Sequence, residues 1–194
     1  MRARLILASS SPRRIELLRE AGVEAEVIPS PVEELHDTAL DYRHLCEVNA
    51  GRKACDVASR HPGAWVIGAD TLVCLDGQPL GKPADLAAAR QMLQSLSGRV
   101  NQVCTGVCVI DPAGKEHVFH EVTEVEFLPL SDEVIDDYMA KVHTLDKAGA
   151  YAAQEHGDQI IAEIRGDFSN VVGLPIKKLL EFLAALDACV LSSR

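Results

Sequence analysis

The segment from Ser9 to Arg14 reads SSSPRR and places three hydroxyl groups next to two guanidinium groups. A serine followed by proline favours the start of a helix, where backbone N–H groups lack partners and carry partial positive charge. Hydroxyl and guanidinium donors beside such N–H groups suit phosphate oxygens. The segment therefore predicts a phosphate-binding turn that includes Ser9, Ser11, Arg13 and Arg14. The alternative is an ordinary capped helix with two solvated arginines.

An aspartate follows a short apolar run in the segment WVIGADT, which spans residues 65–71. The run predicts a buried strand over 65–69, with Asp70 at its carboxyl end, where α/β sheets commonly bind their ligands. A carboxylate in that place could bind a divalent metal or accept a proton from water. Alternatively, Asp70 caps a turn of the local backbone.

Four other side chains could contribute charge or hydrogen bonds to the same chemistry. Lys82 lies in a Gly-Lys-Pro turn that proline makes rigid, and Glu34 lies in a predicted loop over 29–37. Lys53 lies on a predicted helix, and Gln154, in a glycine-containing stretch, offers both donors and an acceptor. Taken singly, solvated surface side chains and structural turns explain these residues at least as well.

Several common classes of protein lack support in this sequence. It contains no GxxxxGK[ST], GxGxxG, HExxH or GxSxG motif, which argues against a P-loop protein, a dinucleotide-binding fold, a zinc protease and a serine hydrolase. The net charge of −10 argues against nucleic-acid and membrane-surface partners. The N-terminal apolar stretch is too short for a signal peptide, and the six cysteines form no CxxC pair. We therefore expect a cytoplasmic protein with free, mostly buried thiols.

The elements that must position these residues alternate between strands and helices. Short apolar runs predict strands at 4–8, 25–28, 65–69, 100–110, 117–127 and 159–164. Residues 71–75 should continue extended after the third of these, before a hairpin turn at Asp76-Gly77. Helical periodicity predicts helices at 12–22, 41–60, 85–96, 131–142 and 176–188. This order predicts an α/β protein of mixed α+β character, with one domain over residues 1–194 and flanking helices on a twisted mixed sheet.

Five segments, taken together, resemble the Maf family of nucleotide pyrophosphatases over nearly the whole chain. They read LILASSSPRR, VIGADTLVCLDGQPLGKP, LQSLSGRVNQVCTGV, LDKAGAYAAQ and GDFSNVVGLP, in the order of the family. The resemblance implies a two-lobed fold around a central cleft, related to inosine triphosphate pyrophosphatases and often dimeric. It also implies hydrolysis of a nucleoside triphosphate to the monophosphate and pyrophosphate with Mg²⁺ or Mn²⁺.

The same resemblance implies roles for individual residues. Asp70 matches the proton acceptor that has been proposed for the family. Glu34, Lys53 and Lys82 match positions in the charged pocket. The positions linked to substrate choice are matched by Arg13, Thr71 and Gln154.

The loop that contains Gln154 resembles the branch of the family acting on dTTP and UTP. An amide can satisfy the ring N–H and a neighbouring carbonyl of thymine or uracil, whereas a guanine edge suits the glutamate of the branch acting on 7-methyl-GTP. Two positions depart from the family pattern. Asn101 replaces a frequent histidine, and Glu155 replaces a glycine, so that a second carboxylate could compete for the base edge.

The resulting hypothesis is an in-line attack of water on the α-phosphorus. Arg13, Arg14, Lys82 and the serine turn hold the triphosphate, while Asp70, with Glu34, holds a divalent metal or activates water. The alternatives are a pyrophosphatase for modified purine nucleotides or 7-methyl-GTP, and a non-enzymatic nucleotide-binding regulator of cell division. Because binding alone needs cations more than carboxylates, Asp70 and Glu34 favour catalysis.

Overall fold

The computed structural model describes residues 4–36 and 40–186 and contains a seven-stranded sheet. Its strands are β1 (Leu5–Leu7), β2 (Glu26–Val27), β3 (Trp65–Leu75), β4 (Gln78–Leu80), β5 (Val100–Ile110), β6 (Glu116–Phe127) and β7 (Ile161–Arg165). They run in the order β2-β1-β3-β5-β6-β7, and β4 pairs with β3 off this path. β1 pairs in parallel with β2 and β3, whereas β3–β4 and β6–β7 are antiparallel. The expected mixed sheet is therefore confirmed.

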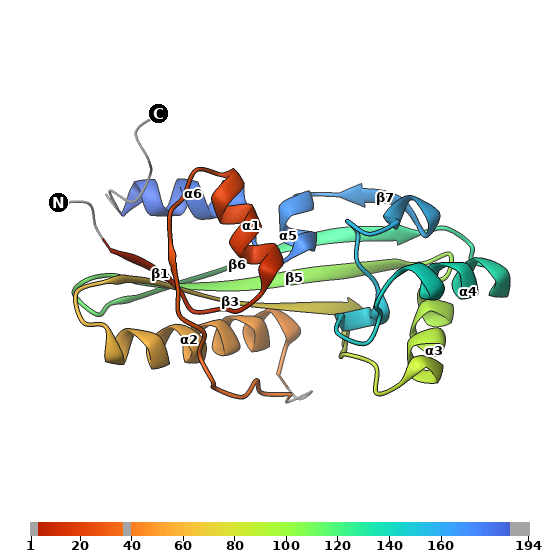
Figure 1. Cartoon of the computed structure of the whole chain (residues 1–194), viewed down its shortest axis with the longest axis horizontal. Coiled ribbons are helices and arrows are strands. Elements are labelled where there is room, and N and C mark those ends of the chain that lie inside the picture. The colour runs from red at the N-terminus through yellow and green to blue at the C-terminus, as the bar shows by residue number, and fades with distance from the viewer. Residues whose placement is uncertain (1–3, 37–39, 187–194) are drawn as a thin grey trace. The chain divides into compact units, whose positions relative to one another are not determined.

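Helices flank this sheet, as expected from the sequence (Figure 1). Those that the structure describes are α1 (Pro12–Glu20), α2 (Tyr42–Arg60), α3 (Leu86–Leu96), α4 (Asp132–Lys141), α5 (Phe168–Val172) and α6 (Ile176–Ala185), with 3-10 turns η1 (Ala148–Ala150) and η2 (Gly157–Gln159). None of the helices described is long and apolar enough to span a membrane.

Capping side chains set where the longer helices begin. The carboxylates of Asp41 and Asp85 accept hydrogen bonds from Arg43 N and Ala88 N at 3.0 and 2.7 Å, and the hydroxyl of Ser131 caps α4. These bonds satisfy N–H groups that have no partner within the helix. α1 differs, because Ser11 makes no side-chain cap bond and Pro12 occupies the first turn.

The chain forms two compact units. Unit 1 comprises residues 1–71, 105–121 and 173–194, and unit 2 comprises residues 72–104 and 122–172. The strands β3, β5 and β6 each contribute residues to both units. The core of unit 2 is formed by apolar side chains of β3, α3, β5, β6, α4 and the turns before β7, among them Leu93, Phe127, Ile135, Tyr138 and Ile160.

In unit 1, alternate residues of the strands face different helices. The side chains of Leu5 and Leu7 pack with residues of α1 and α6, whereas that of Ile6 packs with residues of α2. Figure 1 shows α1 and α6 on one face of these strands and α2 on the other. Because side chains alternate along a strand, Asp70 of β3 faces α2 and its neighbour Thr71 faces α1 and α6. This alternation divides the candidate site into two sets of contacts.

Three expectations about the elements need correction or limitation. The strand does not end before Asp70, because β3 continues without a break to Leu75 and then pairs with β4. The segment 168–172, for which the sequence predicted no helix or strand, forms the short helix α5. Cys46, Cys74, Cys104 and Cys108 are buried cysteines outside any disulfide, and Cys55 is a partly buried one. Cys189 and the predicted end of the last helix at residues 187–188 lie outside the described residues.

Candidate active site

Asp70 lies near the middle of β3 and is almost fully buried, with 3% of its surface exposed. Its Oδ1 accepts a hydrogen bond from Lys53 Nζ at 2.8 Å, and its Oδ2 accepts one from Asn49 Nδ2 at 3.1 Å. Both partners come from α2, one helical turn apart, so they share one face of that helix. The buried carboxylate is thus held by a charged donor and a neutral donor, which offset the cost of burying its charge.

Two glycines on the strands allow α2 to come close enough for these bonds. A Cβ on Gly68 of β3 would lie 2.2 Å from Ala50 O, and one on Gly106 of β5 would lie 2.4 Å from Cys46 C. Such distances are shorter than any ordinary contact, so the backbone of α2 rests directly on the backbone of the sheet. Asp70 follows Gly68 on the same face, which brings its carboxylate within reach of the helix.

Lys53 also joins Asp70 to the loop that precedes α2. Its Nζ donates to Glu34 Oε1 at 2.6 Å, and its side chain is only 12% exposed. One ammonium group therefore lies between two carboxylates, and the three groups together carry a net negative charge. Glu34 and Lys53, predicted as members of the charged pocket, are thus adjacent to Asp70, the predicted proton acceptor.

The donor set fits a hard divalent cation. Carboxylate oxygens are the usual protein ligands of Mg²⁺, which commonly takes one or two of them and completes its shell with water and phosphate oxygens. Within residues 4–36 and 40–186, no group of three or more His, Cys, Asp or Glu side chains is arranged to hold a metal. A cation on Asp70 and Glu34 would therefore need water or a phosphate ligand as well.

Arg14 of α1 makes the second set of contacts, on the face of β3 that carries Thr71. Its guanidinium donates to Gly173 O at 2.8 Å, to Ser9 Oγ at 3.2 Å and to Thr71 Oγ1 at 2.9 Å. Burial lowers the pKa of Arg14 from its ordinary value, and the nearby carboxylates of Asp70 and Glu34 act in the opposite direction. Three of its five N–H donors are thus used within unit 1, so Arg14 orders the turn as well as supplying charge.

The turn before α1 has the features of a phosphate-binding segment. Ser9 Oγ accepts from Ser11 N at 3.3 Å in addition to Arg14, which fixes the turn. The side chain of Arg13 is partly exposed and makes no hydrogen bond or ion pair with the residues that the structure describes. Arg13 therefore keeps all its donors for a ligand, at a helix start where N–H groups attract anions.

Two of the predicted residues, Lys82 and Gln154, belong to unit 2. Both side chains are exposed and have no partner among the residues described. Gly149 N donates to Gly81 O at 3.1 Å, so the turn that carries Lys82 is joined to the segment that leads to Gln154. The structure therefore brings these two segments together within unit 2.

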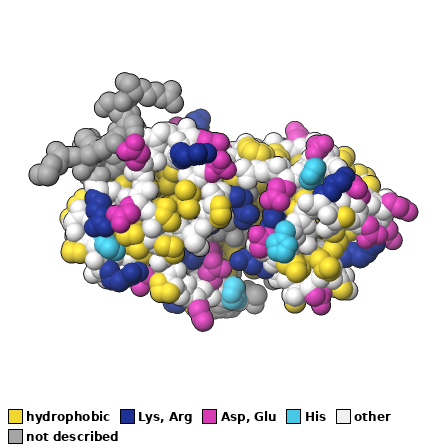
Figure 2. Space-filling view, viewed as in Figure 1, with side chains coloured by type: hydrophobic (Ala, Val, Ile, Leu, Met, Phe, Trp, Pro, Cys, Tyr) yellow, Lys and Arg dark blue, Asp and Glu magenta, His cyan; other side chains and the backbone are white. Residues whose placement is uncertain are grey.

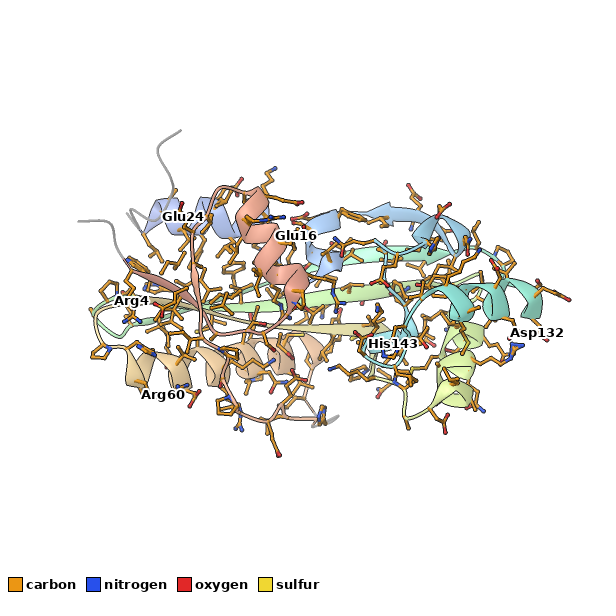
Figure 3. All side chains as sticks on the ribbon, viewed as in Figure 1. Arg4, Glu16, Glu24, Arg60, Asp132 and His143 are labelled. Atoms are coloured by element: carbon orange, nitrogen blue, oxygen red, sulfur yellow. The ribbon has the colours of Figure 1, made fainter. Side chains whose placement is uncertain are left out.

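The segment 143–155 is anchored by buried polar side chains. Lys147, 5% exposed, donates to His143 O at 2.7 Å and lies 3.4 Å from Glu155 Oε1; His143 is labelled in Figure 3. Tyr151 donates to Asn101 Oδ1 at 2.9 Å. The two departures from the family pattern thus have structural partners: Asn101 holds Tyr151, and the carboxylate of Glu155 is paired with Lys147.

Sequence reasoning missed two residues of this site, Asn49 and Thr105. Both are fully or almost fully buried, and Thr105 Oγ1 lies 2.9 Å from Thr71 Oγ1. Asn49 stands four residues before Lys53 and four after Leu45, on the helix face expected to be apolar. A polar residue on that face is a signal that could have identified it. Thr105, inside a β-rich run, carried no comparable signal.

Comparison with known proteins gives a consistent assignment. The family model described as Maf-like protein matches residues 4–186. A dTTP/UTP pyrophosphatase of Akkermansia muciniphila is 47% identical over 94% of this chain and 96% of its own length, and one of Symbiobacterium thermophilum is 50% identical over 92% of each. The Ham1 protein of Staphylococcus aureus has the same fold, with a TM-score of 0.55 and 19% identity over 94% of this chain and 99% of its own.

Proposed function

This chain belongs to the Maf family, and from that premise we propose that it is a nucleoside triphosphate pyrophosphatase acting on dTTP and UTP. It would release the nucleoside monophosphate and pyrophosphate. Relatives that are 47% and 50% identical over more than nine-tenths of their length carry the name dTTP/UTP pyrophosphatase.

The observation that carries the proposal is the buried Asp70 carboxylate with Lys53 shared between it and Glu34. A protein that only binds nucleotides needs cations for the phosphates. It gains nothing from two carboxylates, which repel the ligand. Carboxylates next to a phosphate-binding turn are useful for activating water or for holding a metal.

The residues of the chain can be given distinct tasks in such a reaction. Arg13 and the N–H groups at the start of α1 would bind phosphate oxygens, while Arg14 keeps Ser9 and Thr71 in place. Each oxygen of Asp70 accepts one hydrogen bond and retains room for another, so Asp70 could orient a water and take its proton.

The water oxygen would then bond to the α-phosphorus, and the bond between that phosphorus and the bridging oxygen would break. A divalent metal on Asp70 and Glu34 would neutralise charge on the phosphates and on the departing pyrophosphate. Lys82 is the further cation that we assign to the triphosphate. If Asp70 instead holds the metal, it would act as a ligand rather than as the base, and the metal would supply the positive charge that favours loss of the water's proton.

For the base, we assign recognition of thymine or uracil to Gln154. Its exposed amide offers one acceptor and two donors, which match the N–H and carbonyl of the imide edge. The neighbouring Glu155 would be the natural competitor for a guanine edge. Its ion pair with Lys147 supports a structural role instead.

A panel of nucleotides tests this function. Pyrophosphate release is measured for dTTP, UTP, ATP, GTP and 7-methyl-GTP, with Mg²⁺ and with Mn²⁺. We expect the highest kcat/KM for dTTP and UTP. A preference for 7-methyl-GTP would move the protein to the other branch of the family, and tight binding of dTTP without turnover would favour a regulator.

A further inference from the structure

We propose that Asn49 is a positioning residue, which fastens the loop carrying Glu34 to Asp70 and thereby keeps the two carboxylates on one ammonium group. The inference rests on the function proposed above, because it assigns a task to Asn49 in that reaction. It concerns a residue that acts through Leu35 and Asp70 and that is not among the charged-pocket residues inferred from the sequence.

The side chain of Asn49 makes three hydrogen bonds to two segments. Its Oδ1 accepts from Leu35 N at 2.8 Å, and its Nδ2 donates to Leu35 O at 3.1 Å and to Asp70 Oδ2 at 3.1 Å. The side chain thus pairs with both backbone groups of Leu35, as a neighbouring strand would. The third bond continues from the loop to the carboxylate of β3.

An amide is suited to this task by both its chemistry and its burial. Asn49 is 1% exposed, so any donor or acceptor that lost its partner would remain away from water. Of the common side chains of this size, only an amide supplies an acceptor and two donors without adding charge next to Asp70. An aspartate would place a second carboxylate against Asp70 Oδ2 and Leu35 O. A leucine would leave Asp70 Oδ2 and both backbone groups of Leu35 without these partners.

The position of Asn49 makes it a counterpart of Lys53. Asn49 contacts Leu35 and Asp70 Oδ2, and Lys53 contacts Glu34 and Asp70 Oδ1. Asn49 and Lys53, on successive turns of α2, therefore both connect the loop over residues 28–36 to the carboxylate of Asp70. The lysine supplies the charge, and the asparagine fixes the backbone from which Glu34 extends.

The loop needs such an anchor because it has no regular structure. Residues 28–36 form neither helix nor strand, and the side chain of Glu34 is 42% exposed. An exposed glutamate on an irregular loop would sample several positions without a fixed backbone. Because Asn49 binds both the N–H and the C=O of Leu35, the backbone of the adjacent Glu34 has a defined position.

The test combines hydrogen exchange with a double-mutant cycle. In Asn49→Ala, we expect the amide of Leu35 to exchange faster by about tenfold or more, because its acceptor is gone. In Asn49→Asp, the acceptor remains, so that amide should stay largely protected while kcat/KM for dTTP falls. Arg52→Ala is the matched control. Arg52 lies on the same helix and donates to Glu33 O at 3.4 Å from the exposed side. Removing its side chain should change neither the exchange rate of the Leu35 amide nor kcat/KM for dTTP.

The cycle asks whether Asn49 acts through Glu34. We expect Asn49→Ala to lower kcat at least about tenfold when Glu34 is present, and less than about threefold in the Glu34→Gln background. KM for dTTP should change less than kcat, because Arg13 and the α1 turn are left in place.

Three results would overturn the inference: unchanged exchange at Leu35 in Asn49→Ala, wild-type kcat/KM in Asn49→Asp, or additive losses in the cycle. Additive losses would mean that Asn49 serves stability alone. If the wild-type protein releases pyrophosphate from no nucleotide, the proposed function fails instead. The exchange result then decides separately whether Asn49 fastens the loop.

Discussion

Single residues in this site differ in how much of their hydrogen-bonding capacity the protein already uses. Asp70 and Arg14 are held by two and three partners, whereas Arg13 has none among the residues described. A side chain with internal partners supports both fold and function, and one without them is available for a ligand. This difference predicts distinct outcomes for mutations that the sequence alone would treat as equivalent.

Replacing Asp70 with asparagine should lower kcat by about a hundredfold or more while the protein remains folded. The substitution keeps the size of the side chain but removes the charge that accepts a proton or binds a metal, and its one carbonyl oxygen can accept from only one of Asn49 and Lys53. Turnover is measured with dTTP, and far-UV circular dichroism serves as the control for folding. A folded variant with near-normal kcat would show that another group activates the water.

The two adjacent arginines should separate binding from stability. Arg13→Ala should weaken use of the triphosphate by about 1.5–3 kcal/mol in kcat/KM, with little change in the free energy of unfolding. Arg14→Ala removes three internal hydrogen bonds and should lower the free energy of unfolding by at least about 1.5–3 kcal/mol. Urea denaturation and steady-state kinetics on both variants provide the comparison. Equal stability losses would contradict the roles assigned here.

Among the elements, helix α2 determines the geometry of the carboxylates. It supplies Asn49 and Lys53, and it reaches Asp70 because Gly68 and Gly106 leave room for its backbone. The close contact between helix and sheet is therefore part of the site, although neither glycine can do chemistry.

Gly68→Ala should push α2 away from β3. The added Cβ would lie 2.2 Å from Ala50 O, a backbone atom, so relief requires movement of the helix. We expect a loss of about 1–3 kcal/mol or more in the free energy of unfolding, together with reduced kcat. Gly51→Ala is the matched control on α2, because its Cβ meets only a side-chain atom at 4.0 Å. That variant should be more stable than wild type by about 0.5–1 kcal/mol.

Most of these elements could be predicted from the sequence, because their signals are local. Asp41 and Asp85 cap helices of clear periodicity, and Asp76-Gly77 forms the expected hairpin turn with positive φ at both residues. The extended continuation over 71–75 was predicted, but Asp70 was placed at the end of a strand rather than inside one, because a buried charge interrupts an apolar pattern. Its partners on α2 come from about twenty residues away, and no local pattern shows such pairing.

At the scale of the whole molecule, the net charge of −10 must be reconciled with a polyanionic substrate. Figure 2 shows acidic and basic side chains scattered among apolar ones on the face drawn, without a field of one sign. The cations that we propose to bind phosphate lie instead in two segments, the turn before α1 in unit 1 and the Lys82 turn in unit 2. The local arrangement of charge, rather than the total, is what the proposed function requires.

The choice of base should depend on Gln154 in unit 2. Gln154→Glu removes the amide donors and introduces a charge that repels the carbonyl oxygens of thymine and uracil. A site built to hydrogen-bond a base loses selectivity strongly when its partner group changes. We therefore expect kcat/KM for dTTP and UTP to fall more than that for GTP. Equal losses on every base would show that Gln154 does not contact the pyrimidine.

The position of bond cleavage tests the central claim most directly. The wild-type protein is incubated with dTTP and Mg²⁺ in water enriched in ¹⁸O, and the products are followed by ³¹P NMR. Attack at the α-phosphorus predicts dTMP that carries the heavy oxygen, together with unlabelled pyrophosphate. Formation of dTDP and labelled inorganic phosphate, or unchanged dTTP, would contradict the proposal that this protein is a nucleoside triphosphate pyrophosphatase.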